Sequence, residues 1–228
     1  QRALAIAISG EPGGDYHAAE IRVVTDSVQD IAGNLLANTV SLTLNESPDI
    51  IMPGVESGIV DLTTGTVTIF VNETVDVTPV EFIDLTKISF VGSGKDLAMT
   101  GSTIEAVDDV HFTFQMLEIT RVEGILNSNT PGGDGSAQTL TLLAGAIRDI
   151  GTNLLPVDNT LITLTEIVDT GKPVITEVTL NYSTGVMTIT ANETIDGNPP
   201  NLLNLSKIFL SDSSGAREIE LTGAEFES

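Results

Sequence analysis

The chain has 228 residues, no cysteine and no tryptophan, and its 32 acidic residues against nine basic ones give a formal net charge of −23. This charge argues against a nucleic-acid partner, because phosphate binding needs a basic face. The lack of cysteine excludes disulfides and thiolate metal sites, and no apolar run is long enough to predict membrane insertion. The acidic residues either form a solvated surface or in part bind Ca²⁺.

The first 49 residues are predicted to contain a short helix at 1–8 and a strand at 39–44. Between them, the phrase QDIAGNLL at 29–36 predicts a tight turn in which Asp30 caps backbone N–H groups. Asn34 and the glycine before it tolerate the left-handed conformation that such a turn needs. A second interpretation of Asp30, as a metal ligand, remains open.

Residues 50–169 are predicted to form a series of short strands. In TVTIFV at 66–71, apolar Val and Ile alternate with the intervening residues, which is typical of a half-buried strand. Clusters of Gly, Asn, Asp and Ser separate further predicted strands at 88–91, 96–100, 110–114, 138–144 and 161–165. The letters GSGK at 92–95 predict a hairpin turn, and QMLEITRVEGIL at 115–126 predicts a short helix. This number of short strands favours an all-β, antiparallel sandwich.

The sequence repeats itself with a period of about 120 residues. QDIAGNLL at 29–36 returns as RDIGTNLL at 148–155, and NETVD at 72–76 returns as NETID at 192–196. We therefore divide the chain into the second half of a repeat at 1–49, a complete repeat at 50–169 and the first half of a repeat at 170–228. Each repeat is expected to be a β-sandwich with one short inserted helix.

Half a sandwich cannot close its own core and leaves strand edges unpaired. We expect a neighbouring molecule, or an adjacent segment of a longer chain, to complete each half-repeat. Contacts of the first kind run head to tail, do not close on themselves and produce a filament of identical copies. The two end segments together make almost one whole repeat and lack only the counterpart of about 107–119.

The repeat resembles the immunoglobulin-like repeats of giant bacterial and archaeal cell-surface proteins of the adhesin, surface-array or filament type. The resemblance covers essentially the whole chain and is carried by residues 61–77, 84–90, 137–155 and 169–175. It implies an immunoglobulin-like β-sandwich in an extracellular, cell-surface protein.

The resemblance also implies Ca²⁺ at the joints between repeats. By position, Asp49 and Asp169 would be the linker ligands, with Asp30 and Asp149 in a neighbouring turn. Each linker carries a single aspartate, so a shell of six to eight oxygens would also need backbone carbonyls and Glu166 or Asn45.

The sequence predicts no catalytic site, and we expect the protein not to be an enzyme. His17 and His111 occupy unrelated positions in the repeat, and neither has metal ligands at a suitable spacing. Five N-x-S/T sequons are candidate glycosylation sites: Asn45, Asn72, Asn181, Asn192 and Asn204.

The leading hypothesis is a structural protein of an extracellular filament, sheath or surface layer (S-layer). The alternative is a spacer or binding segment of a large, calcium-stiffened adhesin that serves cell adhesion, although the absence of tryptophan counts against a glycan-binding platform.

Overall fold

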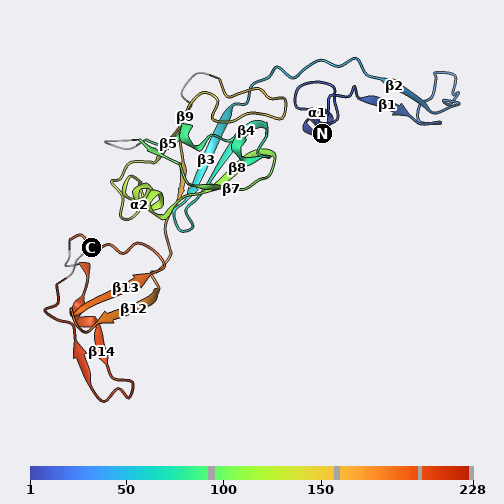
Figure 1. Cartoon of the computed structure of the whole chain (residues 1–228). Helices are drawn as coiled ribbons and strands as arrows, with labels where there is room; N and C mark the ends of the chain where they lie inside the picture. Colours follow the sequence, from blue (N-terminus) through green and yellow to red (C-terminus); the bar gives the residue numbers. More distant parts are fainter. Residues whose placement is uncertain (92–95, 157–159, 200–201, 226–228) are drawn as a thin grey trace. The chain divides into compact units, whose positions relative to one another are not determined.

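The computed structural model describes residues 1–91, 96–156, 160–199 and 202–225, so the hairpin turn predicted at 92–95 lies outside the described residues. The chain forms two compact units, Gln1–Thr170 and Gly171–Ser228. Both are built mostly from β-strands joined by turns (Figure 1). None of the helices in the described part of the chain is long and apolar enough to span a membrane.

The core of the first unit lies between two sheets. One sheet has the strand order β10-β9-β5-β6, and the other has the order β11-β3-β4-β8-β7. The strands are β3 (Val55–Asp61), β4 (Thr66–Val75), β5 (Ile88–Phe90), β6 (Leu97–Ala98), β7 (Thr103–Ile104), β8 (Asp109–Gln115), β9 (Thr139–Leu142), β10 (Thr160–Thr163) and β11 (Thr165–Ile167). All pairs are antiparallel except β11 with β3.

Side-chain alternation on β4 explains how the core is filled. Val67, Ile69 and Val71 are buried, while Thr66 and Thr68 point to the opposite face, as the period-two pattern predicts. Phe112 and Phe114 on β8 face the same core, and Leu140 and Leu142 on β9 contribute to it from the other sheet. The remaining buried members of this core are Val60, Leu62, Val75, Val77, Ile83, Ile88, Phe90, Met99, Met116, Ala146, Ile147, Leu155 and Leu164. The predicted β-sandwich is therefore confirmed, but the prediction that it is antiparallel throughout is wrong, because β11 pairs with β3 in parallel.

The helix α2 (Glu118–Leu126) follows β8 directly. The sequence placed its start at residue 115, but Gln115 is the last residue of β8 and pairs with Thr66 and Thr103. The predicted start is therefore wrong, because strand pairing extends the β conformation past the point where helical periodicity begins. The strands β3, β7 and β11 were also missed by the sequence analysis.

The segment 1–49 contains the helix α1 (Arg2–Ala7) and the hairpin of β1 (Glu20–Val23) and β2 (Val40–Thr43). The pairing of Ile21 with Leu42 reproduces that of Leu140 with Ile162 in the complete repeat. Between the strands, Asp30 and Asn34 form the predicted capped turn, in which the Asp30 carboxylate accepts the backbone N–H of Asn34 at 2.8 Å.

The second unit contains two hairpins, β12 (Ile175–Asn181) with β13 (Val186–Ala191) and β14 (Phe209–Ser211) with β15 (Glu218–Glu220). Leu180 pairs with Met187 as Val60 pairs with Val67, so the register of the complete repeat is preserved.

The two segments expected to be half-repeats expose positions whose sequence counterparts are buried in residues 50–169, the expected complete repeat. Leu140 is fully buried, whereas Ile21 at the same repeat position is 48% exposed. Likewise, Ile69 is fully buried and its counterpart Ile189 is 41% exposed. No apolar side chain in residues 1–49 is buried, nor is any in the described part of residues 171–228. Their apolar faces therefore lack a cover.

This difference in burial predicts that substitution by alanine lowers the free energy of unfolding by unequal amounts at the two equivalent positions. Leu140→Ala is expected to lower the stability of the complete repeat by about 2–5 kcal/mol, because it leaves a cavity in a closed core. Ile21→Ala, at the equivalent position, is expected to change it by less than about 0.5 kcal/mol. Thermal unfolding at a concentration where the chain is monomeric measures both, and equal effects would contradict the assignment of Ile21 to an open face.

Candidate functional site

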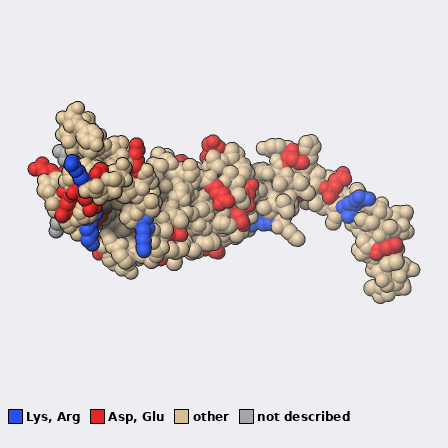
Figure 2. All heavy atoms as spheres, turned by 90° about the horizontal axis from the view of Figure 1, so that it is seen from below, with Lys and Arg blue, Asp and Glu red and all other residues tan. Residues whose placement is uncertain are grey.

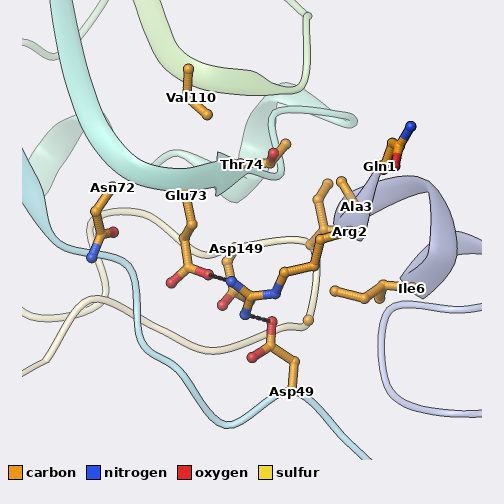
Figure 3. Close-up of a pocket in the computed structure, with 12 residues that line it drawn as sticks. Gln1, Arg2, Ala3, Ile6, Asp49, Asn72, Glu73, Thr74, Val110 and Asp149 are labelled. Carbon is orange, nitrogen blue, oxygen red and sulfur yellow. Dashed lines mark hydrogen bonds and ion pairs between the residues drawn. The ribbon is translucent and has the colours of Figure 1, made fainter. Parts of the chain in front are cut away.

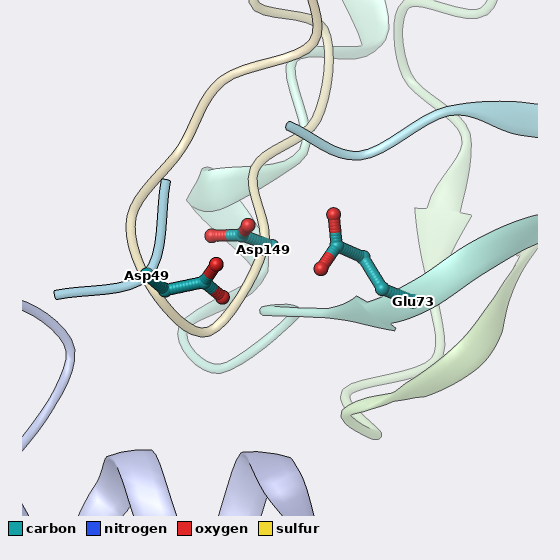
Figure 4. A group of neighbouring side chains, drawn as sticks. All are labelled: Asp49, Glu73 and Asp149. Atoms are coloured by element: carbon teal, nitrogen blue, oxygen red, sulfur yellow. The ribbon is translucent and has the colours of Figure 1, made fainter. Parts of the chain in front are cut away.

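Three carboxylates gather where residues 1–49 meet the complete repeat. Asp49 lies in the linker before β3, Glu73 on β4, and Asp149 in the turn after β9. One carboxylate oxygen of each lies within 4.8 Å of the others, and the three side chains point toward one another (Figure 4). Acidic residues are spread over the visible face of the molecule (Figure 2), but this is the one group of three potential metal ligands within the described residues.

Local turn chemistry holds Asp149 in place. Its carboxylate accepts the backbone N–H of Asn153 at 2.7 Å and the Asn153 side-chain amide at 3.0 Å. The same amide nitrogen donates to the backbone carbonyl of Asp49 at 3.2 Å, which ties the linker to the turn. A Cβ at Gly151 would lie only 2.6 Å from the Asp49 Cβ, so the close approach of linker and turn requires glycine there.

An arginine from α1 enters the pocket that these acids line (Figure 3). The Arg2 guanidinium donates to Asp49 and lies 3.0 Å from the Glu73 carboxylate. The side chain of Arg2 is half exposed, whereas those of both carboxylates are buried. The hydrogen bond to Asp49 raises the pKa of Arg2 further above its ordinary value, so this guanidinium stays charged. The pocket has a volume of about 220 Å³.

Glu73 remains incompletely satisfied. Its Oε2 faces Arg2, but its Oε1 is buried and has no hydrogen-bond partner, and the residue as a whole is 9% exposed. Burial, reinforced by the nearby Asp149 charge, raises the pKa of Glu73 above its ordinary value. Three carboxylates against one guanidinium leave a local excess of negative charge, which favours binding of a cation.

The next linker repeats part of this arrangement. Arg121 on α2 corresponds to Arg2, and Asp169 corresponds to Asp49. The Arg121 guanidinium donates to Asp169 at 2.8 Å and to the backbone carbonyl of Leu62 at 2.9 Å. An ion pair between the helix arginine and the linker aspartate is thus present in both linkers.

The structure brings two of the four predicted metal-ligand residues, Asp49 and Asp149, into one site. Asp30 lies elsewhere, exposed in its own turn, where hydrogen bonds from Asn34 lower the pKa of its carboxyl group. The Glu166 carboxylate is not near the three acids and accepts the backbone N–H groups of Asn129 and Gln138. Asn45 is exposed and outside the cluster of three acids.

Glu73 is not among the metal ligands predicted from the sequence. A signal was available, because the NET phrase occurs twice, at 72–74 and 192–194. Its asparagine has a structural role, since the Asn72 side-chain oxygen accepts the backbone N–H of Gly54 at 2.8 Å, and Asn192 does the same for Val174 at 2.7 Å. All five sequon asparagines are exposed.

The histidines lie apart from this site. His111 is on β8 with its ring 5.9 Å from that of Phe70 and its Nδ1 3.5 Å from an Asp109 carboxylate oxygen. His17 is exposed and contacts Asp15.

Comparison with known proteins gives little beyond the structure itself. No family model matches the chain, and no curated protein matches it. The crystal structure of the N-terminal part of the bacterial S-layer protein SbsC is similar at 15% identity and a TM-score of 0.30, over 76% of this chain and 38% of that one. The S-layer protein structure rSbsC(31-844) is similar at 14% identity and a TM-score of 0.30, over 76% of this chain and 22% of that one. The chain thus spans well under half of either, and likeness at this TM-score carries no structural argument.

The state of Glu73 predicts a pH-dependent effect of Glu73→Gln. Because the folded-state pKa of Glu73 is raised, ionised Glu73 destabilises the fold, and the wild type gains stability as the pH falls through that pKa. In EDTA at pH 7.5, Glu73→Gln is therefore expected to raise the melting temperature. The gap should close toward pH 4.

Glu56→Gln is the matched control, since it removes one charge from an exposed position of β3. Two results would contradict the conclusion that ionised Glu73 destabilises the fold. One is a rise in the melting temperature of Glu56→Gln as large as that of Glu73→Gln, and the other is a difference between Glu73→Gln and the wild type that does not change with pH.

Proposed function

We propose that the protein is a structural, extracellular component of a cell-surface filament, sheath or surface layer, built from tandem immunoglobulin-like β-sandwich repeats. The observation that carries this proposal is the pair of half-repeats whose apolar faces are uncovered, beside a complete repeat of similar sequence in which the equivalent faces form a closed core. A protein with this construction is suited to associate through β-strand complementation.

Energetics support complementation between half-repeats. Covering a side chain such as Ile21, which is 48% exposed, or Leu42, which is 61% exposed, would contribute about 1–2 kcal/mol, roughly half the value for a fully exposed side chain. Several such positions lie on each face, and the adjacent strand edges have backbone groups available for pairing. Partners with the same repeat can supply both the apolar surface and the strand, and contacts between copies would run head to tail.

A second candidate function is a spacer or binding segment of a large adhesin that calcium stiffens. The acidic pocket between the linker and the complete repeat favours this alternative, because a joint held by a cation resists bending. A glycan or cell-surface ligand for such a segment is not identified by any residue pattern. Neither candidate involves catalysis, and we propose no enzymatic activity.

We also propose Ca²⁺ as the cation of the acidic pocket. Ca²⁺ takes six to eight oxygen ligands and tolerates irregular geometry. Asp49 and Asp149 would hold it together with Glu73, whose buried Oε1 has no other partner. The bound ion would supply the positive charge that Arg2 alone does not, and would fix the linker against β4.

Calcium is expected to stabilise the joint. The melting temperature should rise by several degrees in millimolar Ca²⁺ and fall again in EDTA, because binding to the folded state alone adds stability. Asp149→Asn should abolish the response, since it removes one ligand charge while leaving an oxygen for the turn. Asp30→Asn, in the equivalent but exposed turn, is the matched control and should keep it. An identical melting curve with and without EDTA would remove Ca²⁺ from the proposal.

Assembly of the chain is expected to depend on the open apolar face. Sedimentation velocity and electron microscopy should reveal concentration-dependent, elongated oligomers, and Ile21→Lys should prevent them by placing a charge where the complete repeat has a core leucine. Leu161→Lys is the control, because Leu161 is an exposed residue on the outer side of the complete repeat. The proposal fails if the unmodified chain stays monomeric at all concentrations, or if both variants behave alike.

A further inference from the structure

The hairpins β1-β2 and β14-β15 each have strand edges that are paired at the equivalent positions of the complete repeat. In that repeat, β9 lies between β10 and β5, and β5 lies between β9 and β6. The hairpin of β1 and β2 corresponds to β9 and β10, and the hairpin of β14 and β15 corresponds to β5 and β6. Each of these two hairpins is a separate two-stranded sheet. Side by side, they would reproduce the four-stranded sheet.

We propose that β14 of a second copy pairs antiparallel with β1, in the register that β5 and β9 adopt. In the complete repeat, Ile88 faces Leu142, Ser89 faces Thr141 and Phe90 faces Leu140. The repeat converts these pairs to Ile208 with Val23, Phe209 with Arg22, and Leu210 with Ile21. This inference rests on the proposed function and specifies its partner and contact.

The inner face of the proposed pair would be apolar. Side chains alternate along a strand, so Ile21 and Val23 on β1 would share a face with Leu210 on β14 and with Ile208, the residue before that strand. Their counterparts in the complete repeat, among them Phe90 and Leu140, are buried in the core. Pairing in this register therefore puts Ile21, Val23, Ile208 and Leu210 on the core side and leaves Phe209 on the outer side, whereas a slip by one residue would reverse the faces.

The outer face adds complementarity that the complete repeat lacks. Phe209 pairs with Glu220 inside its own hairpin. The proposed register places the Arg22 guanidinium on the other side of Phe209, giving a row of cation, aromatic ring and carboxylate. The same row of the complete repeat holds the small neutral residues Thr141, Ser89 and Ala98. Arg22 and Phe209 are both exposed in the free chain.

The geometry of the first unit favours a second copy over pairing within one chain. The linker residue Asp49 lies beside Glu73, near the end of β4, whereas Asp169 lies with the Leu62 carbonyl just before its start. A strand of this length separates the two linkers by about 30 Å. The two linkers therefore lie at opposite ends of the complete repeat, and we assign the contact to different copies arranged head to tail.

Cysteine cross-linking of the full chain tests the register, because the protein has no cysteine of its own. Directly opposed residues of antiparallel strands have Cα atoms about 4.5–5.5 Å apart, within the range for a disulfide. Under mild oxidation, the variant with Arg22→Cys and Phe209→Cys is expected to give a ladder of reducible oligomers on a non-reducing gel. The yield should increase with protein concentration.

Two further variants calibrate the experiment. Ser89→Cys with Thr141→Cys, the template pair, should form an internal disulfide in the monomer. Arg22→Cys with Ser211→Cys, which shares the outer face but is two residues out of register, should cross-link at least about tenfold more slowly, because its Cα atoms would be too far apart.

Three results would overturn the inference. The first is an internal disulfide in the variant with Arg22→Cys and Phe209→Cys whose yield does not depend on protein concentration. The second is the absence of any cross-link in that variant while the Ser89→Cys, Thr141→Cys variant forms its disulfide. The third is an equal rate of cross-linking of residue 22 to residue 209 and to residue 211. Sedimentation of the unmodified chain separates the causes. If it assembles while the 22/209 pair fails, the register is wrong and the proposed function stands; if it never assembles, the proposed function fails as well.

Discussion

The pairing of two hairpins across one sheet, β5 against β9, is the interaction on which the rest of the structure depends. It joins the first half of the repeat to the second half and lets one apolar face close over the other. Where both halves are present, the buried apolar residues from Val60 to Leu164 form one continuous core. Where only one half is present, the hairpins keep their register but not their burial, because hairpin hydrogen bonds are local and a sandwich core is not.

Electrostatic interactions dominate the joint before the complete repeat. A linker, a strand and a turn each bring one carboxylate to the same pocket, and Arg2 balances only part of the charge. Burial of Glu73 with an unpartnered oxygen is unfavourable unless a second cation is bound. The proposed Ca²⁺ would act beside Arg2 at this joint, which connects the two proposed functions.

Much of the architecture could be predicted from local sequence patterns. Alternation in residues 66–71, the capped turns at Asp30 and Asp149, and the placement of one short helix per repeat depend on neighbours in the chain, and the structure agrees with them. The short strands β7 and β11 could not be predicted, because they exist only through pairing with β8 and β3. The start of α2 was wrong for the same reason, since Gln115 is held in β8 by its partners.

The sequence by itself determined the repeat, its β character and the equivalent positions of Arg2 and Arg121, because these are properties of spacing and residue type, whereas their ion pairs with Asp49 and Asp169 come from the structure. Only the tertiary structure decided which acids meet. Asp30 and Asp149 have nearly identical local sequences, yet only Asp149 lies beside Glu73 and Asp49. The reason is physical: a turn brings a carboxylate into a pocket only when the strands and linker around it are packed in place, and around Asp30 that packing partner is absent from the described residues.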